Sequence, residues 1–290
     1  MDNLQHIRAV YIRYLNDGGQ RVELDLPKSG WNPDTIHISE LGGCSRAIML
    51  RLLGKTGRAK PQQTQDNDEL MWWAGYQFHY LTYEALIHAG IMVCYETAIK
   101  PKYDGVTGRF DMLWMDDVLH LTDIKTVRPN AFKFGELNEE PPRVKDDNAL
   151  QVGGYLLHIA TIDKADVEYI DRGGTNTPLL LPVDQELAKA KAEAAILGLL
   201  AQRDNLPEVP DPLPEEVKLH YSRHKVPLLK WVGLKRDWRC NYCQYADTEH
   251  CKTNGSEDEV TAAEWVNDKR PGDWKFNVTG TRRELVEGLV

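Results

Sequence analysis

Three polar side chains on two neighbouring strand-like segments offer the clearest chemistry in this chain. Asp111 ends the run Gly108-Arg109-Phe110-Asp111, and Asp123 and Lys125 flank Ile124 in the next segment. Residues two apart in a strand face the same side, so we expect Asp123 and Lys125 to project together and Ile124 to face the opposite layer. Two carboxylates and an ammonium group suit Mg²⁺ or Mn²⁺ with an activated water beside it. This set indicates metal-assisted hydrolysis of a phosphodiester.

The connection between the two segments decides whether the two acids can meet. Asp111 and Asp123 share a face of the sheet only if the connection is odd in length and centred on Asp117, or contains a bulge. A two-residue turn of Asp116 and Asp117 would place the carboxylates on opposite faces. Surface acids near a hairpin, beside an incidental lysine, are the alternative interpretation.

Two other segments carry side chains that could complete such a site. Gln151 and Tyr155 are four residues apart, so on a helix they share one face and could contact substrate or hold Lys125 in place. His79 belongs to an aromatic-rich helical segment before the strands and could add a nitrogen ligand. Packing is the commoner role of a lone histidine on such a helix.

The cysteines favour a metal site over a disulfide framework. Their number is odd, at 5, and the chain shows no export signal. Cys94 stands in an apolar run, where a buried, inert thiol is expected. The remaining thiols, three near the C-terminus and one far upstream, are Cys240, Cys243, Cys251 and Cys44. Four thiolates could hold structural zinc or an iron–sulfur cluster, and His250 is an alternative ligand.

Two basic stretches interrupt an acidic protein whose formal net charge is -9. Residues 44–60 contain five basic residues and no acid, and residues 218–239 contain seven basic residues and one acid. Aromatic residues within the second stretch suit single-stranded DNA, because stacking and backbone charge need no sequence code. A solvated surface and aromatic packing are the alternatives. The residues expected to contact DNA are Arg46, Arg51, Arg223, Lys225, Trp231, Lys235 and Arg236.

The composition is that of a globular protein. The chain has 290 residues, of which 42% are hydrophobic and 27% charged, and its mean hydropathy is -0.49. No apolar run is long enough to span a bilayer, and the N-terminal residues lack the pattern of a secretion signal. We therefore expect a cytoplasmic protein without a membrane partner.

Hydrophobic periodicity and turn residues predict an alternation of helices and strands. Helices are expected at 4–15, 39–53, 69–89, 149–160, 183–203 and 262–266, and strands at 91–100, 106–114, 118–127 and 165–170. The polar stretch 128–148 is too long for a routine connection and is either functional or mobile. Closely spaced prolines in 206–214 mark a boundary. The expected divisions are 1–60, a core at 61–205, a cysteine-bearing segment at 206–260, and a tail at 261–290.

The order of these motifs resembles a known family. Cys44-Ser45-Arg46, Gly75 to His79, Gly108 to Asp111, Asp123-Ile124-Lys125, Gln151 to Tyr155 and the C-terminal cysteine trio follow the succession of the RecB-type branch of the PD-(D/E)XK nucleases. The chain looks most like the iron–sulfur members: CRISPR-associated adaptation exonucleases, their phage-encoded relatives and the AddB nuclease domain. The resemblance covers residues 37–252. It departs from the family pattern in its second acid, Asp rather than Glu, and in its longer last cysteine gap.

The resemblance implies a fold and a set of roles. It implies an α/β PD-(D/E)XK restriction-endonuclease-like core, a mixed central sheet flanked by helices, with an iron–sulfur-stapled helical subdomain. The metal ligands would be His79, Asp111, Asp123 and the Ile124 carbonyl; Lys125, Gln151 and Tyr155 would complete the catalytic set. Cys44, Cys240, Cys243 and Cys251 would hold a [4Fe-4S] cluster, with zinc as the alternative.

These observations together predict a Mg²⁺- or Mn²⁺-dependent DNA exonuclease or end-trimming nuclease acting on single-stranded DNA or DNA ends. CRISPR adaptation, recombination and repair are the settings the resemblance implies, in a prokaryotic cell or from a phage, with proteins of those pathways as partners. Two alternatives stay open: a non-catalytic DNA-binding adaptor that keeps the fold as scaffold, and a zinc-stapled interaction protein.

Overall fold

The computed structural model describes most of the chain, and its residues fall into two units. Described are Tyr14, Gly18 and residues 32–59, 62–133, 135–159, 161–174, 176–204, 216–221, 229–235, 238–241, 243–246, 248–251, 275–279 and 282–287. The first unit comprises Met1–Leu53 and Lys60–Glu208, and the second comprises Gly54–Ala59 and Val209–Val290. The helices expected at 4–15 and 262–266 lie outside the described residues, except for Tyr14, and so does the whole proline-rich segment 206–214.

A mixed five-stranded sheet forms the centre of the first unit, and a mixed central sheet is what the family resemblance implied. Its order is β2 (Met92–Ala98), β4 (Arg109–Met115), β5 (Leu119–Val127), β6 (Lys164–Asp171) and β7 (Leu179–Pro182). Only β5 and β6 run parallel to each other; the other neighbours are antiparallel. A separate parallel pair joins β1 (Ile36–His37) to β3 (Val106–Thr107). The sequence did not predict β7, and it merged β3 and β4 into one strand.

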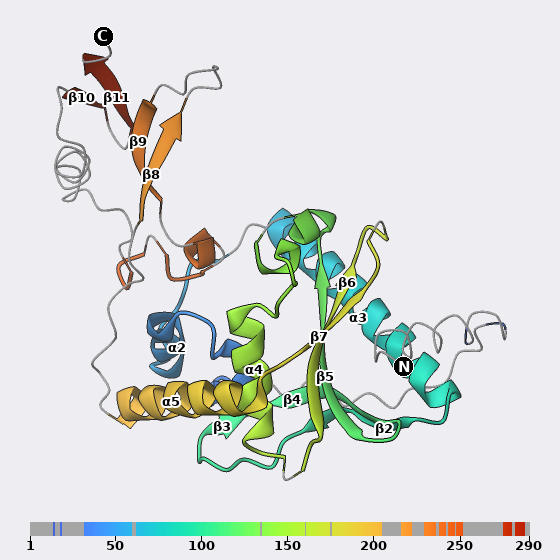
Figure 1. Ribbon diagram of the computed structural model, residues 1–290. Coiled ribbons are helices and arrows are strands. Elements are labelled where there is room, and N and C mark those ends of the chain that lie inside the picture. The colour runs from blue at the N-terminus through green and yellow to red at the C-terminus, as the bar shows by residue number, and fades with distance from the viewer. Residues whose placement is uncertain are drawn as a thin grey trace. The chain divides into compact units, whose positions relative to one another are not determined.

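Helices cover both faces of this sheet (Figure 1). The helix α3 (Gln62–His88) lies on one face, while α4 (Asp146–Leu156) and α5 (Gln185–Asp204) lie on the other. Tyr83 and Leu86 of α3 join Met112, Trp114 and Ile124 of the sheet in one buried cluster. This cluster fixes α3 over β4 and β5, the two strands that carry the candidate site.

The start of α3 differs from the expectation. We expected a polar linker up to residue 68, whereas α3 begins at Gln62. Residues 62–68 are polar but contain neither glycine nor proline, so nothing in them stops a helix. The end of α3 agrees with the sequence: Gly90 has φ 72° and donates its N–H to the carbonyl of Ile87.

Two adjacent glycines divide the segment expected to be a single helix at 39–53. The structure has a short 3-10 helix, η1 (Ile38–Glu40), and then α2 (Ser45–Leu52), whose N-cap residue is Cys44. A side chain at Gly42 would stand 2.5 Å from Cβ of Asp147 on α4. The absence of a side chain at Gly42 therefore lets this segment pack closely against α4.

Glycines also allow α4 to pack closely against its neighbours. A Cβ at Gly153 would lie 2.1 Å from the carbonyl oxygen of Ala188 on α5, and one at Gly154 would lie 2.7 Å from Ile38. Side chains at these positions would push α4 away from α5 and η1. The Gly-Gly pair, which weakens helix propensity, is thus explained by packing.

The stretch 128–148 is ordered through short elements. It contains two 3-10 helices, η2 (Pro129–Lys133) and η3 (Gly135–Asn138), before α4 begins. Tyr169 of β6 accepts a hydrogen bond at 3.0 Å from the Lys145 N–H and donates one at 2.8 Å to Asn148 Oδ1. These contacts anchor the entry to α4, which carries Gln151 and Tyr155.

The second unit is mainly β in its described part, whereas we expected a helical subdomain. Its sheet has the order β10 (Lys275–Thr279), β11 (Arg282–Glu287), β9 (Leu229–Lys235) and β8 (Glu216–Tyr221), with antiparallel neighbours throughout. The 3-10 helix η4 (Trp238–Asn241) bears the first cysteine of the trio. Among the described residues of the whole chain, no helix combines the length and apolarity that crossing a membrane requires.

Candidate functional site

Three acidic residues lie in a row across three neighbouring strands. Met112 pairs with Thr122 and Met115 with Leu119, so the connection is odd in length, is centred on Asp117, and sets Asp111 opposite Asp123. On the other side of β4, Thr97 pairs with Phe110, which sets Glu96 of β2 opposite Asp111. The register required for Asp111 and Asp123 to meet is therefore confirmed, and Glu96 extends the row.

One group of side chains in the described part of the chain has the composition of a metal site. Ligand atoms of His79, Glu96 and Asp111 all lie within 4.8 Å of one another. The Tyr83 hydroxyl donates a 2.9 Å hydrogen bond to Glu96 Oε1 and lies 3.3 Å from Nδ1 of His79. Arg109 Nε contacts Glu96 Oε2 at 2.7 Å. These contacts fix the carboxylate of Glu96 beside the imidazole.

Glu96 was not identified from the sequence. It has φ 44° and is only 7% exposed, which combines a left-handed backbone with burial of a charged residue. Such a conformation costs a non-glycine residue about 1–3 kcal/mol and persists only where the surrounding structure enforces it. The signal available in the sequence was a single acid inside the apolar run 91–100, because a buried charge requires partners.

Asp123, Lys125, Gln151 and Tyr155 form a connected chain of polar contacts between β5 and α4. The ammonium group of Lys125 lies 2.9 Å from Asp123 Oδ2 and donates at 2.9 Å to Gln151 Oε1. Gln151 Nε2 in turn donates to Asp123 Oδ1 at 3.1 Å and to the Tyr155 hydroxyl at 2.8 Å. The structure thus brings together four of the residues singled out from the sequence, and Gln151 holds Lys125 beside Asp123.

A backbone hydrogen bond links these polar contacts to the group formed by His79, Glu96 and Asp111, called the metal-type group below. The Ile124 N–H donates to Asp111 Oδ2 at 2.6 Å, between Asp123 and Lys125. Asp123 itself is outside the group formed by His79, Glu96 and Asp111. Its Oδ2 is buried and, among the described residues, accepts no hydrogen bond of acceptable geometry, although the Lys125 ammonium group is near. An under-satisfied buried carboxylate oxygen is the type of atom that a cation or an ordered water would occupy.

The electrostatics of the site also favour a cation. Burial and the neighbouring charge of Asp123 raise the pKa of Asp111 to about 6. Burial opposes the charged form of His79, but Asp111 and Glu96 outweigh it and raise the pKa of the imidazole. Burial likewise opposes protonation of Lys125, but Asp123 and Asp111 raise its pKa above the ordinary lysine value. Excess negative charge thus accumulates around Asp111, and Lys125 stays an ammonium group.

The donor set fits a hard divalent cation. Carboxylate oxygens are the preferred protein ligands of Mg²⁺, and Mn²⁺ also accepts imidazole nitrogen. Both ligand types occur together in the group formed by His79, Glu96 and Asp111. The under-satisfied oxygen of Asp123 is close in the chain to this group, because the next residue, Ile124, donates its N–H to Asp111. The Ile124 carbonyl stays a predicted ligand.

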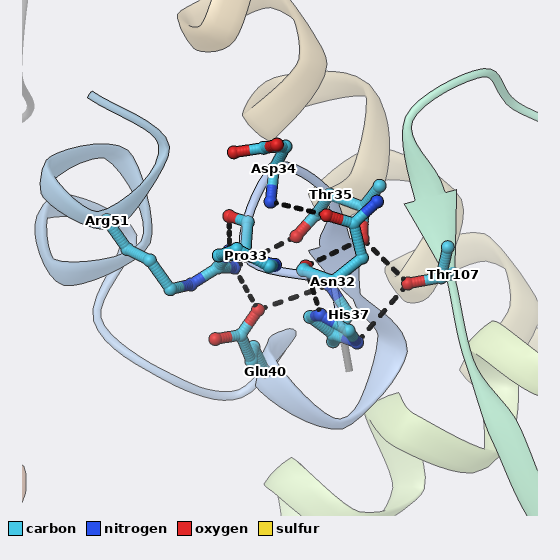
Figure 2. A network of polar contacts seen from close by, with 8 residues as sticks. All are labelled: Asn32, Pro33, Asp34, Thr35, His37, Glu40, Arg51 and Thr107. Carbon is cyan, nitrogen blue, oxygen red and sulfur yellow. Dashed lines mark hydrogen bonds and ion pairs between the residues drawn. The ribbon is translucent and has the colours of Figure 1, made fainter. Parts of the chain in front are cut away.

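Arg51, expected to contact DNA, is engaged within the fold (Figure 2). Its guanidinium contacts Glu40 Oε2 at 2.5 Å, Thr35 O at 3.0 Å and the Pro33 carbonyl, and its side chain is 10% exposed. Glu40 also accepts the His37 N–H at 3.1 Å. This network joins α2 to the segment before η1, so a phosphate would have to displace these partners of Arg51.

Only some of the other residues expected to contact DNA belong to the described part of the chain. Arg46 lies in the first turn of α2 and is half-buried. Trp231 and Lys235 belong to β9, and Arg223, Lys225 and Arg236 lie outside the described residues. DNA binding by this set stays a prediction.

The cysteines of the second unit lie in one compact turn. Cys240 and Cys251 are each 7% exposed, and the Cys243 N–H donates to the Cys240 carbonyl at 3.3 Å. Residues 55–58 are hydrogen-bonded to this turn, because the Arg58 N–H donates to Gln244 O and the Tyr245 hydroxyl donates to Lys55 O. Cys44 belongs to the first unit, so a site formed by all four thiolates stays a prediction. None of the five cysteines, all of which are described, forms a disulfide.

No family model matches the sequence, and no curated protein does. Among solved structures, the protein SSO0001 aligns with 66% of this chain and 84% of its own, at 16% identity and a TM-score of 0.36. LHK-Exo, an alkaline exonuclease from Laribacter hongkongensis, aligns with 60% of this chain and 91% of its own, at 16% identity and a TM-score of 0.38. The LHK-Exo complex with dAMP gives the same values. Similarity at this level assigns no family.

Proposed function

We propose that this protein is a divalent-metal-dependent nuclease that hydrolyses phosphodiester bonds of DNA. The observation that carries the proposal is the row of Glu96, Asp111 and Asp123 across β2, β4 and β5, with Lys125 held beside Asp123. A buried excess of carboxylates next to an ammonium group suits a site where a cation and a phosphate meet.

His79, Glu96 and Asp111 would hold the cation, and Asp123 with the Ile124 carbonyl would complete its coordination. When bound, Mg²⁺ or Mn²⁺ supplies Lewis acidity and a water of lowered pKa. Asp123 and Asp111 raise the pKa of Lys125, which favours the ammonium form and a role other than general base. Its N–H groups therefore orient the attacking water or stabilise negative charge on the phosphate, and Gln151 fixes the ammonium group for this task.

The finer function follows the sequence resemblance. We infer an exonuclease or end-trimming activity on single-stranded DNA or DNA ends, in CRISPR adaptation, recombination or repair, in the cytoplasm of a prokaryotic cell. Cys44, Cys240, Cys243 and Cys251 would hold a [4Fe-4S] cluster, with zinc as the alternative. Burial of Cys240 and Cys251 supports a structural role for these thiols.

The test is cleavage of end-labelled single- and double-stranded DNA with Mg²⁺, Mn²⁺ or chelator. We expect metal-dependent cleavage by the wild type and a loss of at least about 100-fold in Asp123→Ala and Lys125→Ala. Lys102→Ala is the matched control, because Lys102 also pairs with a carboxylate at 2.9 Å, Glu193, but on the exposed surface. Unchanged cleavage in either site variant would contradict the site assignment. DNA binding without cleavage by the wild type would contradict the proposal and favour an adaptor.

A further inference from the structure

Arg109 is a cation at the candidate site that the proposed chemistry does not yet use. It stands on β4 two residues before Asp111, and its Nε contacts Glu96 Oε2 at 2.7 Å. Its side chain is 29% exposed. Among the described residues, its terminal Nη1 and Nη2 groups make no hydrogen bond or ion pair. Arg109 therefore presents a held guanidinium whose outer nitrogens are available.

Glu96 fixes the direction of this guanidinium. The carboxylate is held on its other oxygen by the Tyr83 hydroxyl at 2.9 Å, and the backbone of Glu96 is constrained at φ 44°. Pairing with the Glu96 carboxylate requires only one charged donor, so a lysine at position 109 could make this ion pair as well as an arginine. A guanidinium held through Nε still has N–H groups on both terminal nitrogens, directed outward in one plane. Their spacing matches two oxygens of a phosphate.

Two tyrosines of α3 extend the same environment. The rings of Tyr76 and Tyr80, one helical turn apart, are 5.8 Å from each other, and Tyr76 is 6.0 Å from His79. Burial, together with Glu96, raises the pKa of both phenols, while Arg109 acts in the opposite direction on each. Both phenols are therefore neutral: their hydroxyl groups can donate hydrogen bonds to an anion, and their rings can stack on a nucleotide base.

We propose that Arg109 binds a phosphate of the DNA backbone next to the metal site, and that Glu96 is the positioning residue that orients it. The inference rests on the proposed nuclease function and adds a substrate contact to it. Arg109 transfers no proton, because guanidinium stays charged in proteins. It donates hydrogen bonds to phosphate oxygens, and these bonds strengthen as negative charge grows on the phosphate during attack.

The alternative is that Arg109 only holds Glu96 in place for the metal. The two roles differ in their effects on metal affinity and on phosphate binding. A holding role predicts weaker Mn²⁺ binding when Arg109 is replaced, with DNA binding in chelator unchanged. A phosphate contact predicts weaker DNA binding in chelator, with Mn²⁺ binding not weakened, because loss of Arg109 removes a positive charge that compensates the Glu96 carboxylate.

The test compares Arg109→Gln and Arg109→Lys with Arg203→Gln. Arg203 is the control: it contacts Asp204 through Nε at 3.0 Å and is 27% exposed, but it stands at the end of α5, where its Nη1 also donates to the Asp104 carbonyl at 3.2 Å. Binding of a fluorescein-labelled oligonucleotide is measured in chelator from about 50 to 200 mM salt. Mn²⁺ binding is measured by calorimetry, and cleavage by steady-state kinetics.

We expect Arg109→Gln to reduce the slope of log affinity against log salt by about 0.7–0.9 and to lower kcat/KM about 100-fold. Arg109→Lys should restore the salt slope of the wild type, because the positive charge is kept. It should recover less than a tenth of the lost kcat/KM, because an ammonium group lacks the paired, coplanar N–H groups of a guanidinium. Arg203→Gln should match the wild type in all measurements. An unchanged salt slope in Arg109→Gln overturns the inference. A wild type that binds DNA but never cleaves it overturns the nuclease function, while the salt slope still tests Arg109.

Discussion

Single side chains decide the electrostatics of the site, and Asp111 is the carboxylate whose charged form is opposed both by burial and by a neighbouring negative charge. Burial and the charge of Asp123 raise its pKa to about 6, whereas the ordinary aspartate value is 3.8. The folded state therefore binds the Asp111 proton more tightly than the unfolded state does. The stability that this group contributes is present below pH 3.8, declines as pH rises between 3.8 and about 6, and is absent above that range.

Asp111→Asn should raise the stability of the metal-free protein at pH 7.5 by about 1 kcal/mol, or roughly 2–4 °C in Tm, with little gain at pH 4. The amide oxygen can still accept the Ile124 N–H. Mn²⁺ should raise the Tm of the wild type more at pH 7.5 than at pH 5, because the cation competes with the proton for Asp111. Thermal unfolding at both pH values measures these effects; an Mn²⁺-dependent shift that persists in Asp111→Asn would contradict the ligand assignment.

Gln151 is the side chain that holds the site together across β5 and α4. Gln151→Leu removes its contacts to Lys125, Asp123 and Tyr155, so we expect kcat to fall about 10–100-fold with KM changed less than about threefold. Tyr155→Phe removes one acceptor only and should lower kcat less than about tenfold. Steady-state kinetics with DNA check the order, and equal effects of the two substitutions would argue against Gln151 as the positioning group.

At the scale of elements, the site depends on how closely α4 approaches its neighbours. The position of Gln151 over β5 requires α4 to lie directly against α5 and η1, and Gly153 and Gly154 permit this approach. The short connection centred on Asp117 has a comparable role for the sheet, because a one-residue change would reverse the faces of β4 relative to β5.

Gly153→Ala should lower the free energy of unfolding by about 1–3 kcal/mol, because its methyl group would overlap the Ala188 carbonyl. Gly198→Ala on α5 is the matched control. A Cβ at Gly198 meets nothing within 4 Å, so alanine should raise the free energy of unfolding by about 0.5–1 kcal/mol through helix propensity. Urea unfolding of both variants provides the measurement, and a loss in both would show that packing at Gly153 is not the cause.

At the scale of the whole molecule, the chain consists of two units of different construction. The first is an α/β unit that carries the candidate site, and the second combines residues 54–59 with the C-terminal part in a β-rich unit. Residues 54–59 follow Leu53, the C-cap residue of α2, and they are hydrogen-bonded to the turn of their own unit that bears the cysteine trio.

Protein purified without oxygen should be brown and contain iron if the four cysteines bind a [4Fe-4S] cluster. Cys251→Ser should remove the colour and lower Tm by several degrees, whereas Cys94→Ser should keep the colour, because Cys94 is outside the set. Visible absorption and metal analysis distinguish the outcomes. Colourless protein with stoichiometric zinc would replace the cluster with a structural zinc site.

The sequence alone determined the features that depend on local pattern. Alternating and helical periodicities located most strands and helices of the first unit, Gly90 located the end of α3, and the spacing of Asp123, Lys125, Gln151 and Tyr155 identified side chains that do meet. Segments without such a pattern were missed: β7, the first turns of α3 and the strands of the second unit.

Only the tertiary structure decided the surroundings of Glu96, Arg109 and Arg51. Each depends on partners far away in the chain or on backbone conformation: Tyr83 and Arg109 surround Glu96, and Glu40 with Thr35 engages Arg51. Burial and long-range contacts set the energy of a charged group, and neither is encoded in the residues beside it. For this reason the types of candidate site residue were readable from the sequence, but the composition of the group formed by His79, Glu96 and Asp111 was not.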